Sequence, residues 1–170
     1  MNPFKKTFPY GKHYLDNKDI KSVIDVLKSG SLTQGPKIKE AEEYIAKYVG
    51  AKYAVLVSSC TAGLHISCKT LNIKPKDKTV MSPITFVSTA NASLYCGAKI
   101  VFSDIDDESI NLSSEILKKT INKDSKIKCI IPVHFGGVPC DMKKINFFAK
   151  KKNINIIEDA AHALGAKYST

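Results

Sequence analysis

Short apolar runs that alternate with segments of helical spacing constrain the fold of this chain more than any other feature. From residue 51 onward, apolar runs rich in β-branched side chains are followed by segments whose apolar residues recur every three or four positions. The predicted strands are 53–57, 79–81, 99–102, 127–132 and 154–157, and the predicted helices are 62–70, 86–95, 113–121 and 142–151. Because each helix returns the chain to the same end of the sheet, this order predicts a mainly parallel sheet covered on both faces. The expected fold class is α/β, a three-layer α/β/α domain.

Two further helices are predicted before this alternating region. The pair Asp16-Asn17 can cap the first helix, and Gly30 ends it. Pro36 suits the first turn of the second helix, which Gly50 ends. We therefore predict an N-terminal helical segment and a sheet-containing region. Their bounds are residues 1–50 and 51–170.

The charge of the chain raises the question of an anionic partner, and its distribution argues against one. The net charge is +10, but all 26 basic residues are lysine and are dispersed among 16 acidic residues. Arginine is the residue that binds phosphate groups and guanine bases through two parallel hydrogen bonds. Its absence therefore argues against nucleic-acid recognition. The run Lys150-Lys151-Lys152 is interpreted as the exposed C-terminal end of a helix. We expect small-molecule partners, with no nucleic acid and no membrane.

Cysteine usage and the length of the apolar runs predict a cytoplasmic protein. The apolar runs are too short to cross a bilayer, and residues 1–6 lack the apolar stretch of a signal peptide. The five cysteines form no Cys-x-x-Cys pair, as is typical of free thiols in a reducing compartment. A site built from His134, Asp141 and His162 matches no common zinc spacing, so both histidines are interpreted as satisfied core side chains. We predict no metal.

Polar residues follow the predicted strands at their carboxyl ends, where parallel α/β sheets bind ligands. These residues are 58–61, 82–86, Asp104, 134–137 and 158–162. Between Ser58 and Gly63, small residues join a strand to a helix, so backbone amides at a helix N-terminus could face a phosphate. The segment matches neither the Walker pattern nor the dinucleotide-binding glycine pattern, and simple capping of the helix by serine or threonine is the alternative.

Asp159 follows an apolar strand and precedes two alanines, which places its carboxylate at the inner edge of the sheet. An unpaired charge is unfavourable there, so Asp159 needs a partner. The alternatives are a structural ion pair, a cap on the next helix, or the protonated nitrogen of a heterocycle. Phe86, which begins its helix beside Thr85, could lie flat over such a ring or could belong to the core.

Six motifs stand in order along the chain. They are GSLTQGP (30–36), SCTAGLH (59–65), SPITFVSTAN (82–91), GAKIVFSDID (97–106), IPVHFGG (131–137) and IEDAAHALGA (157–166). In this order they resemble the DegT/DnrJ/StrS family of sugar-nucleotide aminotransferases, which are fold-type I pyridoxal-phosphate enzymes. The resemblance is closest to the UDP-4-amino-4,6-dideoxy-N-acetyl-beta-L-altrosamine transaminase branch. It implies that residues 51–170 are the N-terminal part of an aspartate aminotransferase-like large domain.

The resemblance implies roles for residues in these motifs. The residues matched to cofactor binding are Cys60, Thr61, Ala62, Phe86, Asp159 and His162. The first three match the loop that holds the cofactor phosphate, the phenylalanine matches the aromatic that stacks on the pyridine ring, and the aspartate matches the acid paired with the ring nitrogen. His162 stands where many members have a glutamine near the phenolic oxygen of the cofactor. Thr33 lies in the stretch that approaches the sugar nucleotide at the subunit boundary.

One departure from the family pattern concerns the lysine that forms a Schiff base with the cofactor. In the family this lysine lies downstream of the motif around Asp159, and no lysine of this chain stands in that context. The resemblance therefore implies that residues 1–170 are the N-terminal portion of a longer enzyme, without its small C-terminal domain, or a truncated product. We expect the chain by itself to be inactive.

The expected function of the full-length protein is transamination of a nucleotide-linked 4-keto-6-deoxy sugar. The resemblance implies a UDP-linked substrate, glutamate as amino donor, a homodimer, and a place in the biosynthesis of surface polysaccharides or of nonulosonic acids such as pseudaminic acid. The enzymatic alternatives are a UDP-4-keto-pentose aminotransferase for lipid A modification and a sugar dehydratase of the same family, in which histidine replaces the lysine. The non-enzymatic alternatives are a truncated cofactor-binding fragment and a basic nucleic-acid module.

Overall fold

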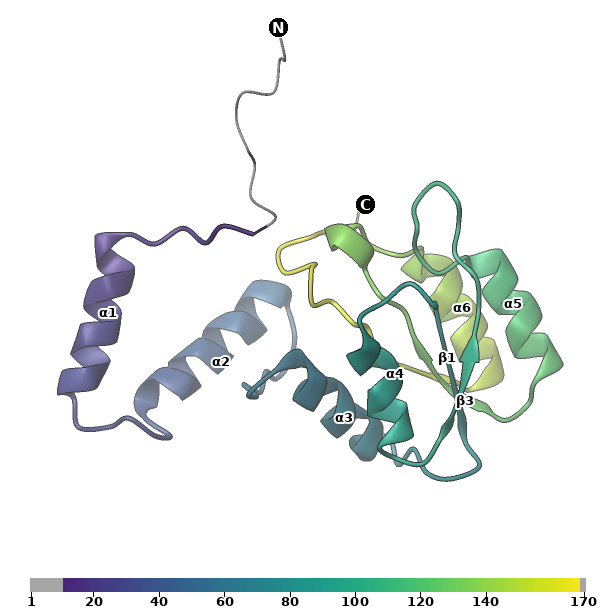
Figure 1. Cartoon of the computed structure of the whole chain (residues 1–170), viewed down its shortest axis with the longest axis horizontal. Coiled ribbons are helices and arrows are strands. Elements are labelled where there is room, and N and C mark those ends of the chain that lie inside the picture. Colours follow the sequence, from purple (N-terminus) through teal and green to yellow (C-terminus); the bar gives the residue numbers. More distant parts are fainter. Residues whose placement is uncertain (1–10, 169–170) are drawn as a thin grey trace, which may run out of the picture. The chain divides into compact units, whose positions relative to one another are not determined.

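The computed structural model describes residues 11–168, and the chain divides after Leu56 into two compact units (Figure 1). The first unit contains two helices, α1 (Asn17–Lys28) and α2 (Pro36–Val49). The second unit contains the sheet and the other helices. The expected assignment of residues 51–170 to one domain stays a prediction.

The two helices of the first unit begin and end where their capping residues predict. The Asp16 carboxylate accepts the backbone N–H groups of Lys18 (2.7 Å) and Asp19 (3.1 Å), and the Asp19 carboxylate accepts the Asp16 N–H (2.9 Å). This reciprocal capping box fixes the start of α1. Pro36 begins α2 and Gly50 ends it. No residue of either helix is buried within the structure, so their apolar faces are exposed.

The predicted strand at residues 53–57 is not formed. These residues belong to no strand of the sheet, and the Leu56 N–H donates to the Glu42 carboxylate at 2.8 Å. Val55 is 75% exposed. The prediction was wrong because an apolar, β-branched run forms a strand only where a second strand lies beside it. Among residues 11–168, no such neighbour is present.

Four parallel strands form the sheet of the second unit, in the order β2-β1-β3-β4. They are β1 (Lys78–Met81), β2 (Lys99–Phe102), β3 (Ile127–Ile131) and β4 (Asn155–Ile156). In the register of the sheet, Met81 of β1 pairs with Phe102 on one side and with Ile131 on the other. The strands run in one direction, as predicted for a sheet built from helical crossovers.

Helices cover both faces of this sheet (Figure 1). They are α3 (Cys60–Thr70), α4 (Val87–Leu94), α5 (Ser114–Lys123) and α6 (Met142–Lys152), and a short 3-10 helix, η1 (Phe135–Gly137), follows β3. Successive residues of β1 point to opposite faces: Met81 packs with Leu64 of α3, whereas Val80 packs with Leu117 of α5 and Ile145 of α6. The predicted three-layer α/β/α architecture is confirmed. None of the helices in residues 11–168 has the length and apolarity needed to cross a membrane.

Candidate functional site

The carboxyl ends of β3 and β4 carry the residues around which the site is built. Beyond β4 the chain continues beside β3, because the Asp159 N–H donates to the Pro132 carbonyl oxygen (2.9 Å) and the His134 N–H donates to the Asp159 carbonyl oxygen (3.1 Å). Val133 and Asp159 therefore form a parallel bridge. The bridge places Asp159 at the inner edge of the sheet, where the sequence predicts it.

The Asp159 carboxylate is buried, with only 4% of the residue exposed, and its contacts are to neutral groups. Thr89 Oγ1 donates to Oδ2 at 2.7 Å, the Ala161 N–H donates to Oδ1 at 3.3 Å, and the Cys60 thiol lies 3.8 Å from Oδ1. None of the ion pairs formed within residues 11–168 includes Asp159. Because a buried carboxylate held by neutral donors alone is unfavourable, a cation brought by a ligand would bind here favourably.

The turn before α3 lies beside this carboxylate. Ser59 caps the helix, since its Oγ accepts the Ala62 N–H at 3.2 Å, so the capping alternative is confirmed for this serine. The N–H groups of Cys60 and Thr61 belong to the first turn, where backbone donors have no acceptor within the helix. The turn therefore combines a cap with two backbone donors suited to an anion.

The Cys60 thiol and the Asp159 carboxylate affect each other. Burial, and then the negative charge of Asp159 and its hydrogen bond to the thiol, raise the pKa of Cys60. The thiol therefore stays protonated, so no second negative charge develops beside the acid.

Phe86 stands at the N-terminal end of α4 and is 73% exposed, so the alternative that it belongs to the core is wrong. The Thr89 N–H donates to the Phe86 carbonyl oxygen at 3.1 Å. Phe86 and the Thr89 hydroxyl that contacts Asp159 are thus carried by the same turn of helix. An exposed aromatic ring in this place offers a flat apolar surface to a ligand.

His134 is a satisfied core histidine, as predicted. It is 4% exposed, its Nδ1 accepts the Cys140 N–H at 3.1 Å, and its Nε2 lies 2.9 Å from Glu158 Oε2. Because Nδ1 is the acceptor, the ring proton lies on Nε2 and is donated to Glu158. This hydrogen bond lowers the pKa of Glu158, to which the Tyr168 hydroxyl also donates at 2.8 Å. The network ties the segment after β4 to the loop after β3.

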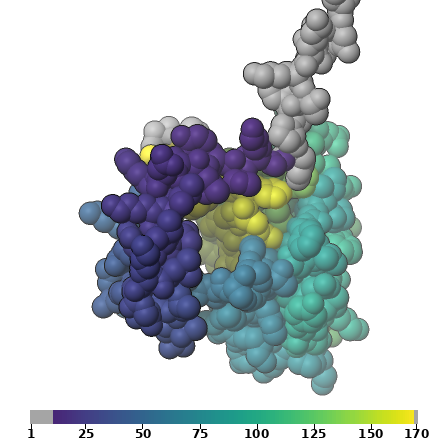
Figure 2. Space-filling model, turned by 60° about the vertical axis from the view of Figure 1, so that its left-hand side comes forward, coloured from purple at the N-terminus to yellow at the C-terminus, as the bar shows by residue number. Residues whose placement is uncertain are grey.

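His162 and Thr33 are placed differently from the buried acid. His162 is exposed, so the interpretation that it is a core histidine is wrong, and its ring lies 6.3 Å from the Phe135 ring in an edge-on arrangement. Atoms of the segment that carries it are visible in yellow in Figure 2. Thr33 is exposed between α1 and α2, in the first unit, so it is not among the residues that the second unit brings together.

Sequence reasoning missed Thr89, which contacts Asp159 directly. A weak signal was present: Thr85 lies just before, and Thr89 within, the first turn of a helix that follows a strand of the same sheet. Only the folded chain shows that this turn faces the carboxyl end of β4.

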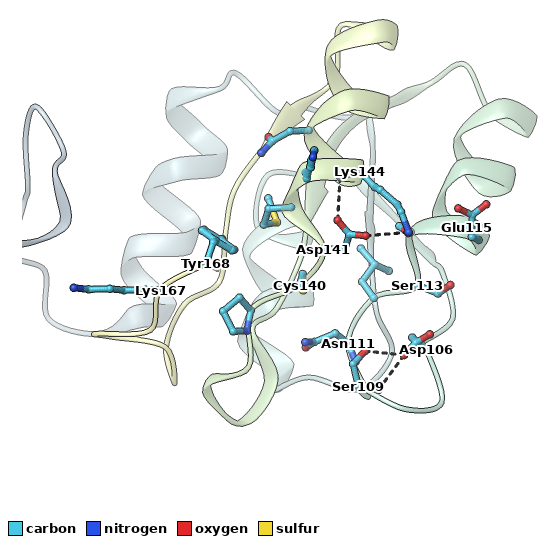
Figure 3. Close-up of a pocket in the computed structure, with 16 residues that line it drawn as sticks. Asp106, Ser109, Asn111, Ser113, Glu115, Cys140, Asp141, Lys144, Lys167 and Tyr168 are labelled. Atoms are coloured by element: carbon cyan, nitrogen blue, oxygen red, sulfur yellow. Dashed lines mark hydrogen bonds and ion pairs between the residues drawn. The ribbon is translucent and has the colours of Figure 1, made fainter. Parts of the chain in front are cut away.

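A pocket of about 940 Å³ lies elsewhere, at the N-terminal ends of α5 and α6 (Figure 3). Both of its aspartates have partners within the pocket: Asp141 pairs with Lys144 at 3.1 Å, and Asp106 accepts the Ser109 hydroxyl at 2.9 Å. Asp159 does not line it. No three His, Cys, Asp or Glu side chains within residues 11–168 are grouped so that they could hold a metal ion. The candidate site is therefore the surface around Asp159, Cys60 and Phe86.

Comparison with known proteins places this chain among aminotransferases. The sequence model of the DegT/DnrJ/EryC1/StrS aminotransferase family matches residues 13–170. Two curated relatives are each 41% identical over 160 residues, which are 94% of this chain and 41% of the relative. They are the spore coat polysaccharide biosynthesis protein SpsC of Bacillus subtilis and the UDP-4-amino-4-deoxy-L-arabinose–oxoglutarate aminotransferase of Shewanella sediminis.

Two solved structures share the fold. PseC of Helicobacter pylori, an aminotransferase involved in the biosynthesis of pseudoaminic acid, matches with a TM-score of 0.88 and 31% identity, over 97% of this chain and 44% of that one. NtdA of Bacillus subtilis, with the bound cofactor PMP, matches with a TM-score of 0.83 and 27% identity, over 89% of this chain and 35% of that one. The chain thus spans less than half the length of these relatives.

Proposed function

Because the chain belongs to the DegT/DnrJ/EryC1/StrS aminotransferase family, we propose that the complete protein transfers an amino group to a keto sugar with pyridoxal phosphate as its cofactor. The family match confirms the resemblance carried by the six motifs. The observation that supports the proposal most directly is the Asp159 carboxylate, which is buried among neutral donors without an ion pair in residues 11–168.

The residues present fit pyridoxal phosphate at both of its ends. The protonated nitrogen of a pyridine ring would supply the positive charge that Asp159 lacks. The N–H groups of Cys60 and Thr61 at the start of α3 are donors of the kind that bind phosphate. Phe86 offers its exposed ring for stacking. The 3.8 Å separation of Cys60 Sγ and Asp159 Oδ1 shows that the turn and the acid are neighbours.

In this proposal the side chains of the chain hold and balance charge. Bound pyridoxal phosphate would supply an electron sink for the electron pair released when a substrate carbon loses its proton. Asp159 keeps the proton on the ring nitrogen, and Thr89 holds the carboxylate that does so. His162 is exposed, so its ring is accessible for the predicted hydrogen bond to the phenolic oxygen of the cofactor.

The proposed substrate is a UDP-linked 4-keto-6-deoxy sugar, with glutamate as amino donor. The similarity to PseC and to SpsC supports a pathway that supplies pseudaminic acid or another surface polysaccharide sugar. The 41% identity to the UDP-4-amino-4-deoxy-L-arabinose–oxoglutarate aminotransferase supports a UDP-4-keto-pentose as the second candidate substrate.

Three further features of the complete protein are proposed from the family pattern. The lysine that forms the Schiff base is expected downstream of the motif at 157–166. The enzyme is expected to be a homodimer in which Thr33 approaches the sugar nucleotide at the subunit boundary. Residues 1–170 by themselves are expected to hold the cofactor without turning over substrate.

The test of this function uses Asp159→Asn in the complete protein. The amide cannot hold the ring nitrogen protonated, so we expect product formation from UDP-4-keto sugar and glutamate to fall by about 100-fold or more, with the fold retained. Mass spectrometry of the product distinguishes an amino sugar from a dehydrated one and separates hexose from pentose substrates. Asp141→Asn, which changes a cap of α6 away from the site, is the matched control. Unchanged turnover in Asp159→Asn would contradict the proposal.

A further inference from the structure

We infer that Thr85 and Thr89 form a directed chain of hydrogen bonds that positions Asp159 for the cofactor. The inference rests on the proposed function and adds two positioning residues to it. Two observations support it: the contact of Asp159 Oδ2 with the Thr89 hydroxyl, and the contact of that hydroxyl with the Thr85 hydroxyl.

The direction of the chain follows from counting protons. Thr89 is fully buried, and its Oγ1 lies 2.7 Å from Asp159 Oδ2. An ionised carboxylate only accepts, so Thr89 spends its one hydroxyl proton on Asp159. Thr85 Oγ1 lies 2.7 Å from Thr89 Oγ1, and Thr89 has no second proton to give. Thr85 therefore donates to Thr89, and Thr89 donates to Asp159.

The chain leaves the two carboxylate oxygens of Asp159 in different situations. Oδ2 is held by a short hydrogen bond from a buried hydroxyl. Oδ1 has longer contacts, at 3.3 Å from the Ala161 N–H and 3.8 Å from the Cys60 thiol. The short bond at Oδ2 is therefore the contact that anchors the carboxylate group.

The aromatic residue of the site caps the N-terminal end of the same helix, α4. Thr85 and Phe86 are adjacent in sequence, and the Thr89 N–H donates to the Phe86 carbonyl oxygen at 3.1 Å. Because Thr89 contacts both Phe86 and Asp159, the start of α4 sets the position of the Phe86 ring relative to the Asp159 carboxylate. This arrangement couples two ends of the proposed site that lie far apart in the sequence.

The test measures the dissociation constant of pyridoxal phosphate in the cofactor-free complete protein. Thr89→Val keeps the shape and removes the hydroxyl, so we expect binding to weaken by about tenfold. Thr89→Ser restores the donor and should restore most of the affinity. Thr85→Val removes only the outer donor and should weaken binding less. Thr79→Val is the matched control, because Thr79 is equally buried but donates to Ser93 at 2.8 Å and does not touch Asp159.

A double-mutant cycle shows whether Thr89 acts through Asp159. In the Asp159→Ala background, Thr89→Val should have no further effect on the dissociation constant. An undiminished effect in that background, or wild-type affinity in Thr89→Val, would overturn the inference.

A second cycle needs no cofactor. In urea unfolding of the cofactor-free protein, the effects of Thr89→Val and Asp159→Ala should be non-additive. Additive effects would overturn the inference. A wild-type protein that fails to bind pyridoxal phosphate would instead refute the proposed function, while the unfolding cycle would still decide the role of Thr89.

Discussion

The thiol of Cys60 and the carboxylate of Asp159 meet at 3.8 Å, where the first turn of α3 approaches the end of the sheet. At the scale of the residue, each group limits the chemistry of the other. Burial, together with the negative charge of the carboxylate, raises the pKa of the thiol and so suppresses the thiolate. The thiol, being neutral, leaves the acid as the one negative charge in this contact. A cationic ligand therefore meets a single, localised charge.

This coupling predicts the reactivity of Cys60. Because the thiolate is the reactive form, a raised pKa means that alkylation by iodoacetamide should be slower near neutral pH than for an unperturbed thiol, and should accelerate only at higher pH. Asp159→Asn removes the negative charge, so it should lower the pKa of the thiol and speed labelling several-fold. The rate is followed by mass spectrometry of the labelled peptide in the cofactor-free protein.

Cys60 is exposed whereas Cys68, Cys96, Cys129 and Cys140 are buried, so labelling of the folded protein reports on Cys60. Cys60→Ser is the control and should abolish labelling of the peptide that contains residue 60. Equal labelling rates with and without the Asp159 charge would show that burial alone governs the thiol.

At the scale of the element, the loop around η1 is held from two sides. The Asn111 side chain accepts the Phe135 N–H at 3.0 Å and donates to the Val138 carbonyl oxygen at 2.9 Å, so it spans the loop. On the other side, the backbone of Gly137 approaches the His162 carbonyl oxygen so closely that an added Cβ would lie 2.9 Å from it. This close approach positions the segment that carries His162.

We therefore expect Gly137→Ala to destabilise the protein more than Gly136→Ala. Both glycines have positive φ, at +86° and +59°, so both substitutions strain the backbone, by about 1 to 2 kcal/mol. Only at Gly137 does the new methyl group also meet backbone, which should raise the loss to about 2 to 3 kcal/mol. Urea unfolding of the two variants measures the difference, and equal losses would show that the close approach to His162 contributes nothing.

Helices and strands differ in how well local sequence predicts them. Helices with clear caps were predicted within a few residues, because Asp16 and Pro36 act on their own first turns. The run at 53–57 was predicted wrongly, because strand formation depends on a neighbour that local sequence does not specify.

At the scale of the whole molecule, this chain spans 41% of the length of two curated relatives, SpsC and the UDP-4-amino-4-deoxy-L-arabinose–oxoglutarate aminotransferase. In the first unit, α1 and α2 bury no residue, and Val23 and Leu27 are 61% and 62% exposed. Isolated short helices are marginal in water, and most helical stability comes from packing an apolar face. The second unit, by contrast, has a buried core on each face of its sheet.

We expect the 170-residue chain by itself to bind pyridoxal phosphate without catalysing amino transfer. The groups around Asp159 all lie in the second unit, so a cofactor can be held noncovalently, whereas no lysine stands in the family context for covalent attachment. Absorbance before and after gel filtration, together with a product assay, tests both parts. Asp159→Ala is the control for binding. Product formed by the chain alone would contradict the assignment of the catalytic lysine to a later segment.

Local sequence was enough to predict the alternation of strands and helices after residue 59, the family motifs, and the placement of Asp159 after a buried strand, because these depend on periodicity and on neighbouring residues. Only the tertiary structure decided which groups meet that carboxylate. Thr89 and Cys60 reach it from separate parts of the chain, and the exposure of Phe86 depends on how α4 packs against the sheet. Contacts of this kind arise from the packing of whole elements, which no short stretch of sequence encodes.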